Sequence, residues 1–433
     1  MEFTKDSSII IKQLIPKLSK CSAYKLLDND ESFNKSLDNL LLLLYKEINK
    51  ADHYVKRKLA KDTIRPILDK QIVYPEMYGG KYMPDYIKTH IDKTIKYQLL
   101  YSVDIEGRKI KIYFGIFSDK DIHDIDIFNK YIRFICSWLY ICGSFSQHAC
   151  SKTLDIFLYF TPFKKTIPRV RGTVLGPSNV NTAYTMQCKE NNEIVLYREE
   201  EWKKVFIHET FHSYGFDPAE HQINSIKGFV KDLFPITSDF YIGEAYVETW
   251  ARILNAAYDS YYSLTNKNDT ENFLLYIRFT LQIERLYSIQ QMSKILNYMG
   301  MDYKDLLDKE TERASKLRSL YREDSNVFAY YILTGIFMNN YYLFLLWCAK
   351  NNSNIFRFSP GEIALKSFKT LIQAQRDDPS LLKAIDILSP KIHHKRDKKD
   401  KKDKKDKRDK NDKRDKNDKI LLYTTRMSAV EIL

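Results

Sequence analysis

The chain contains 433 residues, of which 44% are hydrophobic and 14% aromatic, while glycine (13 residues) and proline (12 residues) are scarce. This composition excludes a wholly disordered chain and collagen-like or proline-rich architectures, and the length accommodates two domains or one large domain with a tail. The formal net charge of +13 suggests a polyanionic partner. Residues 395–419 alone contain 15 Lys/Arg and 8 Asp, however, so +7 of this charge belongs to one short segment.

Residues 1–93 are predicted to form a helical N-terminal region, because apolar residues recur at helical spacing between Leu37 and Ile48. Residues 94–198 are predicted to contain a small mixed sheet. Two β-rich runs flank Glu106-Gly107, which predicts a hairpin at this dipeptide.

The remaining elements of the β region follow in chain order. A helix is predicted from Asp121 or Asp124 to about Cys142, since a short acidic side chain can cap the apolar pattern that follows. Strands are predicted where β-branched and aromatic residues concentrate. These strands are expected at 153–160, Asn181–Thr185 and Glu193–Tyr197.

Residues 199–390 are predicted to be almost entirely helical. A small mixed β region followed by helices is an α+β pattern, so residues 94–390 are predicted to form one α+β domain. Residues 391–433 are predicted to form a low-complexity Lys/Asp tail and a C-terminal segment. Within the tail, Asp recurs at every third position from Asp397 to Asp418 with nothing apolar to bury, which predicts disorder or a solvated single helix.

One uncharged stretch, Val327–Ala349, is long enough to cross a bilayer, which requires ~20 apolar residues. Asn339 and Asn340 lie in its middle, and amides at the bilayer centre are costly without partners. We therefore expect a buried core helix and no membrane span. Residues 1–14 lack the apolar run and the cleavage site of a secretory signal, so an intracellular protein is expected, in the cytoplasm of a host or producing cell or in a virion.

The six cysteines are spaced irregularly and form no CxxC pair. We therefore expect the free thiols of an intracellular protein. A zinc site built from cysteines is not expected, because structural zinc sites pair their cysteines closely in sequence. The cysteines are Cys21, Cys136, Cys142, Cys150, Cys188 and Cys348.

The segment 197–216, YREEEWKKVFIHETFHSYGF, carries the strongest chemical signal. His208 and His212 are four residues apart, so on a helix both imidazoles lie on one face and can bind one metal ion. Glu209 follows the first histidine and can act as the general base toward a metal-bound water. Acids at 199–201 favour a helix start just before this HExxH motif.

A catalytic zinc site has three protein ligands and a water, so a third ligand must come from outside the motif. In GEAYVETWAR, residues 243–252, Glu244 and Glu248 are four residues apart on a predicted helix with largely apolar neighbours. Buried carboxylates require a metal or a partner. Glu244 is therefore the favoured ligand, with Glu248 accepting a hydrogen bond from a ligand imidazole. A solvated face with a Glu248–Arg252 ion pair is the non-functional alternative. Three other residues remain open as the third ligand: Glu248, Asp217 and His221.

HETFH followed by GEAYVE resembles the gluzincin class of zinc metallopeptidases, over about residues 195–255. The resemblance implies a zincin-like fold, a zinc cofactor and a peptide or protein substrate. It assigns the roles of metal ligands, general base and supporting acid to five residues: His208, His212 and Glu244 as ligands, Glu209 as the base and Glu248 as the supporting acid.

Two positions differ from the common pattern of that class, in which Asn precedes the third ligand and Asp follows it by four residues. Here these positions hold Gly243 and Glu248. The rival metzincin pattern places its third ligand where this chain has Pro218, so that class is not favoured. The stretch REEEWKKVFIHETFH also resembles uncharacterised peptidases of large DNA viruses.

The resemblance implies that zinc acidifies its water, that Glu209 takes the proton, and that the hydroxide attacks a substrate carbonyl. A donor, often Tyr or His, must then stabilise the oxyanion. Because extended peptides pair with sheet edges, a strand at Asn181–Thr185 is a candidate substrate edge. Five tyrosines are candidates for the oxyanion donor: Tyr241, Tyr246, Tyr262, Tyr330 and Tyr331.

The alternative function is that of a non-enzymatic structural or interaction protein built on an inactive zincin fold. In that case residues 395–419 would make a weak electrostatic contact with nucleic acid or an acidic partner. Interleaved Asp cancels about half of the positive charge of this tail, which favours a solubilising segment without a partner.

Overall fold

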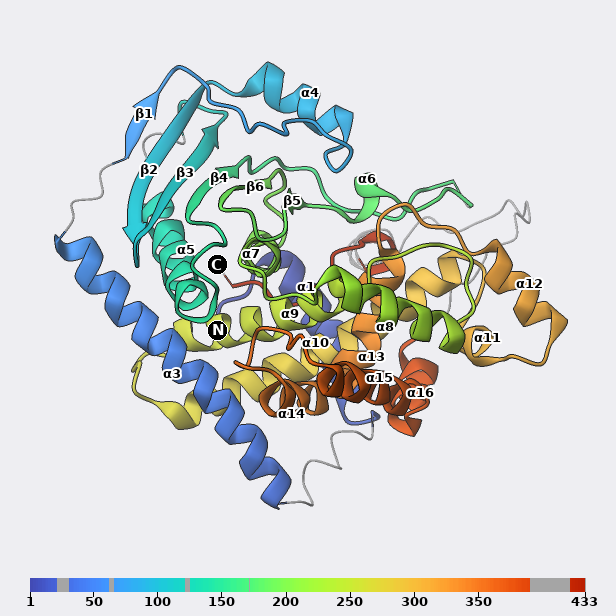
Figure 1. Ribbon diagram of the computed structural model, residues 1–433. Coiled ribbons are helices and arrows are strands. Elements are labelled where there is room, and N and C mark those ends of the chain that lie inside the picture. Colours follow the sequence, from blue (N-terminus) through green and yellow to red (C-terminus); the bar gives the residue numbers. More distant parts are fainter. Residues whose placement is uncertain (22–30, 62–65, 121–124, 171, 390–420, 433) are drawn as a thin grey trace, which may run out of the picture.

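The computed structural model describes residues 1–21, 31–61, 66–120, 125–170, 172–389 and 421–432. A six-stranded mixed sheet is joined to a large helical body (Figure 1), which confirms the α+β prediction. The Lys/Asp tail at 395–419 and the predicted helix starts at Asp121 and Asp124 lie outside the described residues.

The sheet has the strand order β1-β2-β3-β4-β6-β5. β3, β4 and β6 are parallel to one another, whereas β1, β2 and β5 pair antiparallel with their neighbours. At the predicted hairpin, Glu106 and Gly107 have φ angles of 51° and 78°, as the tightest hairpin turns require. The strands are β1 (Ile67–Asp69), β2 (Tyr97–Ile105), β3 (Arg108–Ile116), β4 (Thr153–Leu158), β5 (Ala183–Thr185) and β6 (Asn191–Leu196).

Both faces of the sheet are covered, since successive residues of its central strands point to opposite sides. On one face, Ile156 of β4 joins the main core, to which helix α5 (Ile125–Phe145) also belongs. On the other face, Phe157 joins a smaller, aromatic-rich cluster beneath helix α4 (Asp85–Thr94). Figure 1 shows α4 and α5 on opposite sides of the sheet. Helix α5 connects the parallel strands β3 and β4 and ends close to the predicted Cys142.

The first 94 residues are mainly helical, as predicted, in α1 (Lys5–Leu18), α3 (Glu31–Lys61) and α4. Leu37, Leu41 and Leu44 of α3 are fully buried at the predicted helical spacing. The N-terminal region also contributes β1, which the sequence did not predict. Helix α3 packs against both α5 and α9 (Gly243–Tyr262), so it bridges the sheet region and the helical body.

Most of the chain between residues 202 and 388 is helical, as predicted. Helix α9 lies at the centre of this body, and all of its residues except Glu244 and Tyr262 are buried. The helices are α6 (Pro177–Val180), α7 (Trp202–Ser213), α8 (Glu220–Leu233), α9 (Gly243–Tyr262), α10 (Thr270–Tyr298), α11 (Tyr303–Leu307), α12 (Glu312–Leu320), the π-helical turn η2 (Phe328–Leu333), α13 (Thr334–Asn339), α14 (Tyr341–Asn351), α15 (Glu362–Arg376) and α16 (Pro379–Leu388).

The uncharged stretch around Val327–Ala349 is mostly buried, but it is not the single helix that we predicted. The chain breaks at Asn340, and the segments on either side form an angle of 89°. The break follows from tertiary contacts: Arg285 binds the carbonyl and side chain of Asn339, and Asn340 binds Asp378. Among the described residues no single helix has the length and composition to span a membrane, although this bent pair passes that test as a pair.

The prediction of free thiols is wrong for two of the six cysteines. Cys150 and Cys188 form a disulfide across 38 residues of sequence, whereas the other four thiols are free and buried. The two loops that carry the disulfide meet beside the end of α7, where a Cβ on Gly215 would lie 3.2 Å from the Cys150 sulfur. No local spacing signals this pair, because only the fold brings the loops together.

Residues 421–432, the C-terminal segment, are packed into the body rather than extending from it. Thr424 forms an antiparallel bridge with Thr166, and Ile432 forms one with Phe3 near the N-terminus. Most of the segment is buried, including Arg426 at 1% exposure. Buried groups of α10 bind its backbone: Lys294 donates to the Leu421 and Thr424 carbonyls, and Glu284 accepts from the Val430 amide.

Candidate metal centre

Helix α7 carries the HExxH motif between the sheet and the helical body (Figure 1). Every residue of α7 except Lys203 is buried, including both histidines and Glu209. A buried helix with so many polar groups requires partners for them. The helix ends at Gly215, which has a φ of 68° and whose backbone amide donates a hydrogen bond to the carbonyl of His212.

Three side chains from α7 and α9 converge on one point. The Nε2 atoms of His208 and His212 are 3.3 Å apart, and the Oε2 atom of Glu244 lies 3.0 and 3.2 Å from them. Among the described residues, this triangle is the one group of His, Cys, Asp and Glu side chains that could hold a metal ion.

The size and chemistry of the triangle fit a small tetrahedral cation. Ligand atoms at 2.0–2.1 Å from zinc, placed at tetrahedral angles, are separated by about 3.3 Å. The separations of 3.0, 3.2 and 3.3 Å are close to this value. Two imidazole nitrogens and one carboxylate oxygen are also a donor set that zinc and related divalent metals accept, with a fourth position left for water.

The outer nitrogen of each histidine is held by a buried carboxylate. The Nδ1 of His208 lies 3.0 Å from Glu248 Oε2, and the Nδ1 of His212 lies 2.9 Å from Asp217 Oδ2. Such partners fix the tautomer and ring orientation of a metal-binding imidazole, so that Nε2 faces the ion. Glu248 therefore lies where the supporting acid was predicted. Asp217, an alternative third ligand in the sequence, lies behind His212 instead.

The charge balance of the triangle favours a cation at its centre. Burial would raise the pKa of Glu244, but the two imidazoles outweigh burial and hold this pKa well below its usual range. Burial would lower the pKa of His208, yet hydrogen bonds to Glu244 and Glu248 raise it. The pKa of His212 is also raised, because Glu244 and Asp217 outweigh its burial. A proton or a metal ion is therefore stabilised between these residues.

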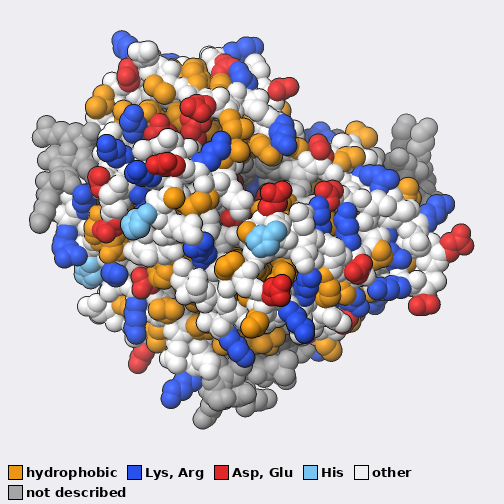
Figure 2. All heavy atoms as spheres, viewed as in Figure 1, with side chains coloured by type: hydrophobic (Ala, Val, Ile, Leu, Met, Phe, Trp, Pro, Cys, Tyr) orange, Lys and Arg blue, Asp and Glu red, His pale blue; other side chains and the backbone are white. Residues whose placement is uncertain are grey.

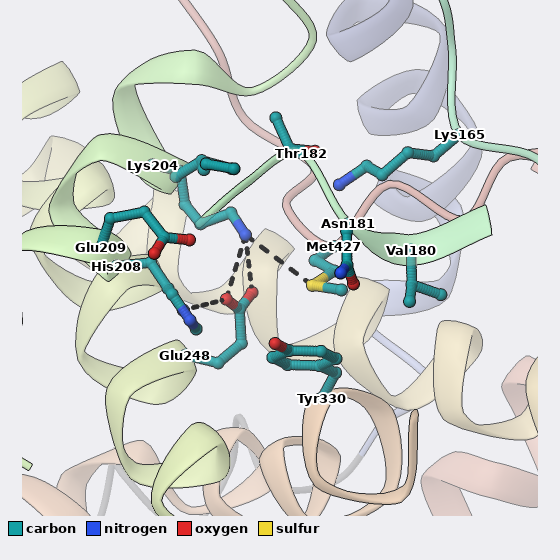
Figure 3. A pocket seen from close by; sticks show the side chains of 12 residues that line it. Lys165, Val180, Asn181, Thr182, Lys204, His208, Glu209, Glu248, Tyr330 and Met427 are labelled. Atoms are coloured by element: carbon teal, nitrogen blue, oxygen red, sulfur yellow. Dashed lines mark hydrogen bonds and ion pairs between the residues drawn. The ribbon is translucent and has the colours of Figure 1, made fainter. Parts of the chain in front are cut away.

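Glu209 is buried at 8% exposure and lies beside His208, with its carboxylate directed into the adjoining pocket (Figure 3). Among the described residues it has no hydrogen-bonding or ion-pairing partner. Burial raises its pKa above the usual value for a glutamate. A free carboxylate with a raised pKa is suited to accept a proton and then release it.

Glu248 is also the centre of a buried charge network. Its two oxygens lie 3.0 Å from Lys204 Nζ, and Arg252 Nε lies 3.0 Å from Oε1. The Glu248–Arg252 ion pair that we considered for a solvated surface is thus present, but both side chains are only 1% exposed. Burial would raise the pKa of Glu248, and Lys204, His208 and Arg252 together hold it well below its usual range.

The five candidate tyrosines for the oxyanion donor differ in the contacts that they make. Tyr330, on the π-helical turn η2, lines the same pocket as His208 and Glu209. Burial and its proximity to Glu244 hold the pKa of Tyr330 well above the usual value, so the phenol keeps its proton. Tyr246 and Tyr331 donate to the backbone carbonyls of Phe356 and Thr425 instead. Tyr241 packs its ring against Gly243, and Tyr262 packs against Tyr258 and Tyr261 at the far end of α9.

One loop that the sequence did not single out connects the metal centre to the sheet edge. Asn326 has a φ of 51°, its side-chain oxygen accepts from the Tyr241 amide at 2.9 Å, and its Nδ2 lies 3.5 Å from Glu244 Oε1. The preceding Ser325 donates to the side chain of Asn181. A non-glycine residue in this left-handed conformation is uncommon and often marks a functional site.

A pocket adjoins the metal centre (Figure 3), and its empty space of about 300 Å³ includes part of the open solvent at its mouth. The approach to strand β5, residues Val180–Ala183, forms one wall, and α7 forms another. Glu248 and Tyr330 also line the pocket, as do Met427 of the C-terminal segment and Lys165, and the last two were not identified from the sequence. Among the described strands β5 pairs only with β6, so the predicted strand near Asn181–Thr185 is an edge of the described sheet.

The C-terminal segment is anchored to the start of α7 by Glu201, whose Oε1 accepts the backbone amides of Met427 and Ser428. The acids at 199–201, which were predicted to favour a helix start, therefore also hold the C-terminal segment through Glu201. Of the other sequence candidates, His221 is exposed on α8 and is not part of the triangle.

Comparisons of the chain with models of protein families, with curated proteins and with solved structures found no match. Figure 2 shows Lys/Arg and Asp/Glu side chains interspersed over the visible face, not gathered into one basic patch. The function must therefore be inferred from the chemistry of the metal centre.

Proposed function

We propose that this protein is a zinc-dependent peptidase of the gluzincin type. The observation that carries the proposal is the convergence of His208 Nε2, His212 Nε2 and Glu244 Oε2 within 3.0–3.3 Å, next to the unpartnered carboxylate of Glu209. A purely structural metal site uses four protein ligands, whereas three ligands leave a position for water. When bound, zinc would supply an acidified water and polarise the substrate carbonyl.

The chain's own residues supply the other parts of the reaction. Glu248 and Asp217 hold the two imidazoles neutral at Nε2 by accepting from Nδ1. Glu209 takes the proton of the attacking water and delivers it to the leaving amine, and burial, which raises its pKa above the usual value for a glutamate, makes it easier for the carboxylate to accept that proton. The protonated phenol of Tyr330 donates a hydrogen bond to the oxyanion of the substrate.

Strand β5 orients the substrate. Its outer edge is unpaired among the described strands, and extended peptides bind such edges through main-chain hydrogen bonds. Arg198 fixes the approach to this edge, because its guanidinium donates to the carbonyls of Asn181, Phe163 and Ser178. A peptide paired with β5 would pass the pocket beside Glu209.

Metal analysis and one isosteric substitution test the proposal. Purified full-length protein is expected to contain one zinc per chain and to cleave members of a mixed peptide library, with the products read by mass spectrometry. Glu209→Gln is expected to retain zinc and lose cleavage by at least ~100-fold, the usual effect of removing a general base. Glu199→Gln is the matched control, because Glu199 lies in the same segment but is exposed.

Absence of stoichiometric zinc would refute the proposal. Zinc without Glu209-dependent cleavage would instead support the alternative of a structural or interaction protein. In that case residues 395–419 would be tested for salt-dependent nucleic-acid binding that disappears when they are deleted.

A further inference from the structure

The pocket beside Glu209 contains two buried ammonium groups, those of Lys165 and Lys204 (Figure 3). They are 1% and 3% exposed. Lysines are almost never this deeply buried unless paired. The two differ in how completely they are paired, and that difference points to a ligand.

Lys204 is fully engaged. Its Nζ contacts both oxygens of Glu248 at 3.0 Å, and the sulfur of Met427 lies 3.8 Å away. It belongs to the network that supports His208, so it has little capacity to bind an additional group.

Lys165 has one ionic partner among the described residues, Glu201, whose Oε2 lies 2.6 Å from its Nζ. An ammonium group has three hydrogens, so two remain for other acceptors. Glu201 is itself shared, because its other oxygen accepts the amides of Met427 and Ser428. Burial lowers the pKa of Lys165 even though Glu201 and Glu200 lie nearby, so these carboxylates do not fully offset the desolvation of its charge. A further anion beside Lys165 would be stabilising.

A second polar group in the pocket also lacks a partner. The Oγ1 of Thr182 is buried, and it makes no hydrogen bond among the described residues although Thr182 is only 4% exposed. Thr182 lines the pocket next to Lys165, on the approach to β5. Val180, Ala183 and Val205 contribute apolar side chains to the lining, and Asn181 adds an amide beside Thr182. A buried cation and an unpartnered hydroxyl beside apolar side chains match a short aliphatic chain that ends in a carboxylate.

We propose that this pocket selects substrates by a carboxylate group, which Lys165 and Thr182 bind while Val180 and Val205 contact the aliphatic part. The inference rests on the proposed peptidase function and deepens it by naming the substrate class. The carboxylate can come from an acidic side chain next to the cleaved bond or from a free peptide C-terminus. Both present the same group to Lys165.

Three probes of nearly equal size separate these sources: N-acetylglutamate amide, N-acetylglutamine with a free α-carboxylate, and N-acetylglutamine amide. Their binding to zinc-loaded full-length protein would be measured by titration calorimetry or ligand-observed NMR. At least one of the two carboxylate probes is expected to bind ~10-fold or more tightly than the neutral amide, as a charge-assisted hydrogen bond provides. Whichever carboxylate probe shows the preference identifies the source.

Lys165→Met is expected to reduce this preference to about one, and Lys165→Arg, which keeps the charge, to retain part of it. Lys164→Met is the matched control, since the neighbouring Lys164 is an exposed lysine that pairs with Asp6 at the surface. Equal binding of the three probes to the unmodified protein would overturn the inference. A carboxylate preference that persists in Lys165→Met would also overturn it, because the metal would then be the binding group.

Thermal unfolding verifies that Lys165→Met is folded, and Thr182→Val provides a second variant that leaves the buried ion pair intact. Thr182→Val is expected to weaken the carboxylate probe and not the neutral one, and equal effects on both would contradict the inference. The binding assay does not depend on cleavage. A peptidase without carboxylate preference refutes only the inference, whereas carboxylate binding without cleavage refutes only the proposed function.

Discussion

Replacing Glu248 by glutamine would test how far the second carboxylate of α9 supports the metal centre. Glu248 Oε1 accepts from Lys204 and Arg252, and Oε2 accepts from Lys204 and His208. A glutamine has one acceptor oxygen and one NH₂ donor. In either orientation of the amide, the NH₂ group faces Lys204 and one more donor. The substitution therefore removes a buried negative charge and also places the NH₂ donor of glutamine against the hydrogen-bond donors of its neighbours.

The expected magnitude follows from burial. All three charged members of the network are at most 3% exposed, and breaking a buried ion pair by removing one partner costs about 3–5 kcal/mol of folding free energy. Because His208 loses its outer partner, zinc affinity is expected to fall by about 10–100-fold. Urea unfolding measures the first effect, and competition with a fluorescent zinc chelator measures the second.

Glu199→Gln serves as the control, since it removes one glutamate charge from the surface near α7. If Glu248→Gln left both the midpoint of unfolding and the zinc affinity unchanged, the view that this network orients His208 would be refuted. A loss of stability with unchanged zinc affinity would restrict Glu248 to a folding role.

Two further outcomes are expected. Tyr330→Phe should retain zinc and KM but lower kcat by about 10²–10³-fold if its phenol stabilises the oxyanion. The control Tyr331→Phe loses a hydrogen bond to the Thr425 carbonyl and should lower stability instead. Equal effects of the two substitutions on kcat would contradict the assignment of Tyr330 as the oxyanion donor. A chain that ends at residue 389 should be strongly destabilised, because Glu201 and Glu284 lose buried partners, and a synthetic peptide of residues 421–432 should restore its melting temperature in a concentration-dependent way. A chain in which a flexible linker replaces 395–415 is the control, and its destabilisation to the same extent would show that the C-terminal segment is not the cause.

The sequence singled out the residues of the candidate metal triangle because their signals are local. Spacing of four residues on a helix places His208 with His212 and Glu244 with Glu248, and the apolar neighbours of Glu244 indicate that its helix is buried. The convergence of the two helices was not visible from spacing. Glu244 was favoured as the third ligand because a buried carboxylate requires a metal or a partner, and the family resemblance agreed with that choice. In the structure, the ligand atoms of His208, His212 and Glu244 lie within 4.8 Å of one another, as this prediction requires.

Other features could not be predicted, because they depend on contacts between distant residues. Asp217 follows His212 closely in sequence and was therefore considered as a ligand, yet the turn at Gly215 places it on the outer nitrogen. At the helix break at Asn340, the stabilising contacts come from the distant residues Arg285 and Asp378. The anchoring of Met427 by Glu201 spans more than 220 residues, and the polar composition of residues 391–420 gave no indication that a buried segment follows.

Because the C-terminal segment lines the pocket, the pocket can be completed only after the end of the chain has been synthesised. During synthesis, Met427 leaves the ribosome after every element of the metal centre, so one wall of the pocket is added last. The message for the Lys/Asp repeat must be translated in frame before that wall can exist, because residues 395–419 precede it. A ribosome that slips within the repeat therefore releases a chain with all three candidate metal ligands but without the residues that cover the buried carboxylates Glu201 and Glu284.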